Sequence, residues 1–123
     1  MSWTIWISAG AILGGLSTAL GAFGAHVLKD RLSEHYLNVF ETAVRYQMYH
    51  ALTLLALGLV ATRIEGLMLK LSGVSFILGV LLFSGSLYLL VLTGQKFWGM
   101  ITPIGGLALI IGWLLLFNDV VKV

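Results

Sequence analysis

Hydrogen-bonding and ionisable side chains gather in one short stretch of this sequence, residues 41–50. Glu41 and Arg45 lie four residues apart with the acid first, the order that favours an ion pair along a helix. His50 closes the stretch with a ring that can act as an acid, a base or a metal ligand near neutral pH. The candidate binding cluster consists of His26, Glu41, Thr42, Arg45, Tyr46, Gln47, Tyr49 and His50.

The spacing of these residues limits the chemistry that they permit. A metal site is disfavoured because no His-x-x-x-His or Glu-x-x-His spacing occurs, and His50 lies about 180° around a helix from Glu41. Nucleophilic catalysis is disfavoured because Ser84 and Ser86 lack the strand–turn–helix elbow that activates a serine. We therefore expect no metal, no cofactor and no catalytic residue. A membrane-embedded enzyme that uses a histidine as acid or base is a third reading, after the two given below.

The composition is that of an integral membrane protein. Of the 123 residues, 59% are hydrophobic and only 10% are charged, whereas a soluble domain carries about 25% charged residues. The mean hydropathy is +1.02. The formal charge of +2 is too small for a basic face that binds nucleic acid. Cysteine is absent, so disulfides and thiolate metal sites are excluded.

Four segments are long enough to form membrane helices, which need about 20 apolar residues to cross a bilayer. We expect helices over about 3–28, 36–62 and 71–93, and a fourth helix that ends at 121. The fourth helix begins at 98 or at 103. The later start is suggested by the pair Thr102–Pro103, which resembles a helix cap followed by a proline in the first turn.

Small residues recur at helical spacing in three of these segments, a pattern that lets membrane helices approach closely. They are Gly10, Gly14, Ser17 and Gly21; Ser72, Ser75, Gly79 and Ser86; and Gly105, Ala108 and Gly112. The sequence thus predicts an all-α integral membrane protein. Residues 1–123 are expected to form a single transmembrane domain, a four-helix bundle with packing seams of glycine, serine and alanine.

The second helix must position the candidate cluster. Its fully apolar part, residues 51–61, covers only about 16 Å of helix, against a hydrocarbon core about 30 Å thick. A full crossing must therefore begin near Ala43, which draws the polar block into the membrane. On the helical wheel the polar groups, with Gln47 as the exception, share one side. Lipid cannot satisfy that side, so we expect it to face the bundle, with His26 as its companion across the hairpin.

Four motifs in order along the chain resemble the YgdD/YwdK-type family of small multi-pass membrane proteins. They are Leu20-Gly21-Ala22-Phe23-Gly24-Ala25-His26, Tyr46-Gln47-Met48-Tyr49-His50-Ala51-Leu52, Leu82-Phe83-Ser84-Gly85-Ser86-Leu87-Tyr88 and Thr102-Pro103-Ile104-Gly105-Gly106. The resemblance implies a location in the bacterial inner (plasma) membrane and carries no assigned activity. It draws attention to His26, Tyr46, Gln47 and His50, and to a secondary set, Ser84, Ser86 and Tyr88.

Two readings of the cluster lead to different functions. In the first, the polar groups hold helices together, and the protein is a non-enzymatic structural or interaction module. In the alternative, ionisable groups at membrane depth mark a site, and the protein is a small transporter, channel or lipid-binding protein. The expected partners are the lipid bilayer, a bound lipid, and a second copy or another membrane protein, but no nucleic acid. Lysines and arginines are nearly balanced between the two sides, so the membrane orientation stays open.

Overall fold

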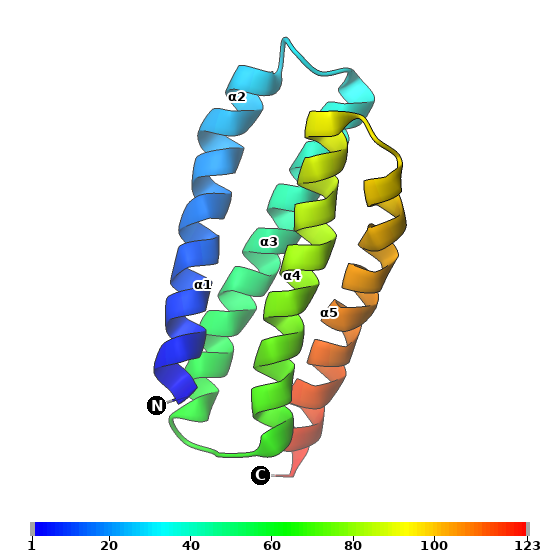
Figure 1. Ribbon diagram of the computed structural model, residues 1–123. Coiled ribbons are helices and arrows are strands. Elements are labelled where there is room, and N and C mark those ends of the chain that lie inside the picture. Colours follow the sequence, from blue (N-terminus) through cyan, green and yellow to red (C-terminus); the bar gives the residue numbers. More distant parts are fainter. Residues whose placement is uncertain (1, 123) are drawn as a thin grey trace.

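The computed structural model describes residues 2–122 and consists of helices joined by short turns. Four long rods run alternately up and down (Figure 1). The first rod is continuous but changes its helical type twice. The helices are α1 (Ser2–Ala19), η1 (Leu20–Gly24) and α2 (Ala25–Leu28) in the first rod, then α3 (Glu34–Ala61), α4 (Leu67–Thr93) and α5 (Phe97–Val121). The predicted all-α four-helix membrane bundle is confirmed.

Three of the four rods are long and apolar enough to cross a membrane by length and composition alone. These are Trp3–Leu28, Leu67–Thr93 and Phe97–Val121. The fourth, α3, has 28 residues, or about 42 Å of helix. It is therefore long enough to cross, but its first half carries the polar block. That α3 also spans the bilayer stays a prediction, based on its antiparallel packing between α1 and α4.

Local signals explain where the helices begin and end. The Ser33 hydroxyl accepts a hydrogen bond from the Tyr36 amide at 3.2 Å and so caps the start of α3. The end of α4 is set by Gly94, whose φ of 71° places it in the left-handed region that favours glycine. The reading of Thr102 as the cap of the last helix is wrong. The helix already begins at Phe97. The Thr102 hydroxyl instead forms a hydrogen bond of 2.6 Å with the Ser86 hydroxyl of α4.

The interior is built on the two central helices, α3 and α4. Helix α1 packs on the outer flank of α3 and helix α5 on the outer flank of α4 (Figure 1). The start of α1, the end of α5 and the α3–α4 turn lie at one end of the bundle. The buried hydrophobic core that joins all four rods consists of Trp6, Leu54, Leu57, Leu69, Phe76, Val80 and Leu109.

The small-residue seams lie at these helix contacts, as predicted. A methyl group added at Gly10 would come within 2.7 Å of the Ala51 carbonyl oxygen on α3. One added at Gly105 would overlap the backbone of Leu82 and Phe83 on α4. Hydroxyls bridge the same seams, since Ser72 donates to the Gly112 carbonyl at 2.7 Å. The helices are therefore as close as two backbones allow.

Candidate functional site

Gln47 lies at the centre of the polar cluster and links three helices. Its side chain is only 4% exposed. The amide nitrogen donates to the Leu13 carbonyl of α1 at 2.9 Å, and the amide oxygen accepts a bond from the Tyr88 hydroxyl of α4 at 2.6 Å. Both ends of the amide are thus satisfied inside the protein. Residues 13, 47 and 88 form a bridge from α1 through α3 to α4.

His50 lies one turn deeper and links α3 to α5. It is also 4% exposed. The indole nitrogen of Trp113 is 3.1 Å from its Nε2, and because indole can only donate, Nε2 must accept. The Nδ1 atom, 2.7 Å from the Tyr46 carbonyl, must then carry the proton and donate. These two contacts hold a neutral imidazole in one tautomer, with the Phe76 ring packed against it.

Serine hydroxyls attach the neighbouring helices to the backbone of α3. Ser17 of α1 donates to the Val44 carbonyl and Ser84 of α4 donates to the Ala43 carbonyl, each at 2.7 Å. Ser86 completes the set on the other side of α4 through its bond to Thr102 of α5. The secondary set predicted from the sequence therefore forms hydrogen bonds between helices: Ser84 bonds to α3 and Ser86 bonds to α5. Tyr88 bonds directly to Gln47 of the cluster.

The prediction that the charged side of α3 faces the bundle is wrong. Arg45 and Glu41 form an ion pair at 4.0 Å, but their side chains are 58% and 46% exposed. Tyr49 is 51% exposed, and Tyr46 is exposed as well. The Thr42 hydroxyl donates a hydrogen bond to the Asn38 carbonyl of its own helix and, within residues 2–122, makes no bond to another helix. These residues share a side, as expected, but that side lies on the outside of the protein.

The inward side of α3 is instead selected by packing. It runs through Phe40, Ala43, Gln47, His50, Ala51 and Leu54. Ala43 and Ala51 are completely buried because their small side chains let the neighbouring helices approach. Gln47, the exception on the wheel, lies on this stripe between them. An uncharged amide can be buried with two partners, whereas an ion pair loses more solvation on burial.

His26 is not brought to the cluster. It is exposed on α2, immediately after the π-helical turn η1. In that turn the Ala25 amide bonds to the Leu20 carbonyl, five residues back. A π turn holds more residues than an α turn, so the 100° step used for the helical wheel does not apply across it. The side chains beyond η1 are thereby turned away from the direction that the wheel assigns.

Within the cluster, the side chains of Gln47 and His50 bond to neighbouring helices. No group of three His, Cys, Asp or Glu residues within 2–122 could bind a metal ion. One contributor that the sequence analysis did not include is Trp113, which donates to His50. Its signal was present, since an indole N–H deep within a membrane span needs a hydrogen-bond partner.

An apolar groove lies beside the cluster on the α1–α4 side. Its volume is about 540 Å³, and it runs between the η1–α2 segment and the end of α4. Phe40 and Tyr88 line it together with Leu20, Phe23, Val27 and Leu92. The lining is almost entirely hydrocarbon, so the groove offers little polar recognition.

Comparison with known proteins places the chain in a family. The family described as "Protein of unknown function (DUF423)" matches residues 20–106. The UPF0382 membrane protein YwdK of Bacillus subtilis is 42% identical over 119 residues, 96% of this chain and 97% of the relative. This chain belongs to the UPF0382 family.

Further relatives agree with this UPF0382 assignment. The UPF0382 membrane protein SAB0533 of Staphylococcus aureus is 46% identical over 112 residues, which cover 91% of each chain. The UPF0382 inner membrane protein YgdD of Escherichia coli K12 is 38% identical over 112 residues, 91% of this chain and 86% of the relative. No solved structure matches. The resemblance to the YgdD/YwdK-type family is confirmed, and the UPF0382 chain is a multi-pass membrane protein.

Proposed function

We propose that this UPF0382 protein is a non-enzymatic interaction module that binds a second copy of itself within the membrane. The observation that carries this proposal is the bonding of Gln47. Its amide is used on both sides to hold α1 and α4 against α3. With His50 also bonded at both ring nitrogens, the buried members of the cluster serve the fold, whereas Glu41, Arg45 and Tyr49 lie on its outside.

The surface that we assign to binding is the outer stripe of α3, defined as Glu41, Arg45, Tyr49 and Leu52. All four side chains are half-exposed or exposed. Charged and hydroxyl groups on a lipid-facing helix are costly unless another helix or water covers them. The other helices expose leucine, isoleucine and valine, which suit lipid. The outer stripe therefore favours a protein partner over lipid.

A second copy fits this stripe by charge. In a two-fold dimer the same patch of both copies meets itself. An acid and a base one helical turn apart can then exchange partners, so that Glu41 of each copy pairs with Arg45 of the other. The long 4.0 Å contact within one copy leaves both groups free to do so. A stripe with only one sign of charge would repel itself.

Disulfide cross-linking in native membranes tests this proposal. The chain contains no cysteine, so a single introduced cysteine can only cross-link to another molecule. We expect Tyr49→Cys to form a disulfide-linked dimer on mild oxidation. The matched control is Ile110→Cys on the outer face of α5, a position that is 58% exposed.

Equal cross-linking at both positions, or none at Tyr49→Cys, would contradict self-association through α3. A product heavier than one chain but different from two chains would show that another protein occupies the stripe, which also contradicts the proposal. Reduction of the dimer band by dithiothreitol verifies that the linkage is a disulfide.

A further inference from the structure

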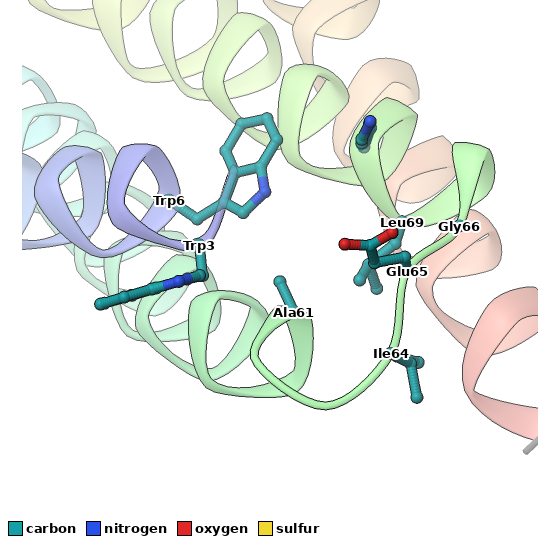
Figure 2. A pocket seen from close by; sticks show the side chains of 8 residues that line it. Trp3, Trp6, Ala61, Ile64, Glu65, Gly66 and Leu69 are labelled. Carbon is teal, nitrogen blue, oxygen red and sulfur yellow. The ribbon is translucent and has the colours of Figure 1, made fainter. Parts of the chain in front are cut away.

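A second cavity, unrelated to the polar cluster, opens at the end of the bundle that holds both termini. Its volume is about 230 Å³. It lies between the start of α1, the end of α3 and the start of α4 (Figure 2). Trp3 and Trp6 line it from α1, Glu65 from the α3–α4 turn, and Lys70 from the first turn of α4. Two aromatic rings, one anion and one cation thus border a small space near the membrane surface.

The indole nitrogen of Trp6 is an unused hydrogen-bond donor at this cavity. Trp6 is 6% exposed, and its Nε1 atom has no partner among the described residues. The far edge of the ring packs on Gly73 of α4, while the nitrogen faces the cavity on the side of Glu65 (Figure 2). Buried indole N–H groups normally have a partner, so this donor calls for an acceptor supplied from outside.

The two charged residues at the cavity are also available to a ligand. Neither Glu65 nor Lys70 takes part in a salt bridge within residues 2–122. Both side chains are exposed. The site therefore offers one anion, one cation and one N–H donor, a set that is complementary to a zwitterion.

The walls of the cavity are held in place from α5. Asp119 accepts a hydrogen bond from the Leu69 amide at 2.7 Å and so satisfies the start of α4. The same carboxylate packs on Gly66, where any larger residue would overlap it. These contacts fix the turn that carries Glu65 and the helical turn that carries Lys70. The cavity is preformed, which lowers the cost of ordering a ligand there.

We propose that this cavity binds the headgroup of a zwitterionic phospholipid with a primary amine, the chemistry of phosphatidylethanolamine. The phosphate lies by Lys70 and the Trp6 N–H, and the ammonium group lies by Glu65. The cavity is smaller than the about 300–1,000 Å³ of sites for drug-sized ligands, which suits a headgroup whose acyl chains remain in the bilayer. Tryptophan at a helix end also marks the depth of lipid headgroups. This proposal does not depend on dimerisation.

Native mass spectrometry of the full-length protein tests the site. The probe is an equimolar mixture of phosphatidylethanolamine, phosphatidylglycerol and phosphatidylcholine with identical acyl chains. We expect the wild type to retain phosphatidylethanolamine preferentially. Lys70→Gln and Trp6→Phe should each reduce that retention by about tenfold, the loss expected for one charge-assisted hydrogen bond. Glu65→Gln should remove the preference over phosphatidylglycerol, because the ammonium partner is gone.

Matched controls lie at the other end of the bundle. Trp98→Phe removes another unpartnered indole N–H, and Lys96→Gln removes a helix-end lysine; both should bind as the wild type does. Glu65 lies on an exposed turn, so Glu65→Gln should fold even if Lys70→Gln or Trp6→Phe does not. Equal retention of the three lipids by the wild type would overturn the proposal, as would cavity variants that match the controls. Displacement of the lipid by equimolar inorganic phosphate or free phosphoethanolamine would overturn it in favour of a soluble phosphate ligand.

Discussion

At the scale of single residues, the neutral amide of Gln47 contributes more to the bundle than any charge in the polar block. The Gln47 amide has a partner at each end, because its nitrogen donates to the Leu13 carbonyl and its oxygen accepts from the Tyr88 hydroxyl. The ion pair of Glu41 and Arg45 remains on the surface, where it keeps its hydration. An amide costs less to remove from water than an ion pair does, so the amide is the group that is buried.

This role of Gln47 predicts a specific pattern of stability. Gln47→Leu and Tyr88→Phe should each lower the free energy of unfolding by about 1–3 kcal/mol, because each leaves a buried polar partner unsatisfied. The double variant should lose less than the sum, since it leaves no orphaned group at that contact. Unfolding by SDS in mixed micelles measures all three.

The control for these single and double variants is Thr18→Val. The Thr18 hydroxyl bonds only to the Gly14 carbonyl of its own helix and is exposed, so little change is expected. Strictly additive losses in the Gln47 and Tyr88 double variant would contradict the direct bond between them.

At the scale of elements, backbone contact between α4 and α5 sets how closely they pack. Gly105→Ala should lower the free energy of unfolding by about 1–3 kcal/mol, because the new methyl group meets the backbone of Leu82 and Phe83, which cannot rotate away. Gly106→Ala is the matched control. Its methyl group would lie 3.7 Å from the Phe83 ring, an ordinary contact, and alanine favours a helix by about 1 kcal/mol.

The same SDS unfolding measurement compares the two alanine variants. We expect opposite signs from adjacent glycines in one helix, with Gly106→Ala neutral or stabilising. If both variants stabilise the protein to the same degree, helix propensity alone would explain the result and the close seam would be contradicted.

The elements also show which features the sequence could predict. Helix number and small-residue seams follow from length, hydropathy and glycine spacing, and the structure confirms them. The buried side of α3 was predicted wrongly because the wheel grouped residues by polarity, whereas Ala43 and Ala51 decide where neighbours fit. The position of His26 could not be predicted, because the π turn at Leu20–Gly24 changes the angular step.

Contacts between distant residues were beyond a single sequence. Trp113 and His50 are 63 residues apart, and no local pattern connects them. The sequence named Gln47, His50 and Tyr88 as candidates, but the partners of their hydrogen bonds follow only from the packing of the four rods.

At the scale of the whole molecule, the bundle presents lipid-compatible side chains on most of its outer surface and one polar stripe on α3. Self-association explains this asymmetry, since two copies would cover each other's Glu41, Arg45 and Tyr49. The polar cluster inside and the polar stripe outside then have separate tasks. The first holds one chain together, and we propose that the second holds two chains together.

The oligomeric state of charge-swapped variants, measured by native mass spectrometry from mild detergent, tests self-association most directly. The wild type should be dimeric. Glu41→Arg or Arg45→Glu alone should weaken the dimer by about tenfold or more, because like charges then face each other.

The decisive arm mixes the two single variants. The Glu41→Arg chain carries two arginines in the stripe and the Arg45→Glu chain carries two glutamates, so the two chains should form a heterodimer. The double swap of Glu41→Arg with Arg45→Glu should restore the homodimer. Recovery of the dimer is expected in both cases. A wild type that is monomeric, or a dimer that is indifferent to all of these swaps, would contradict it.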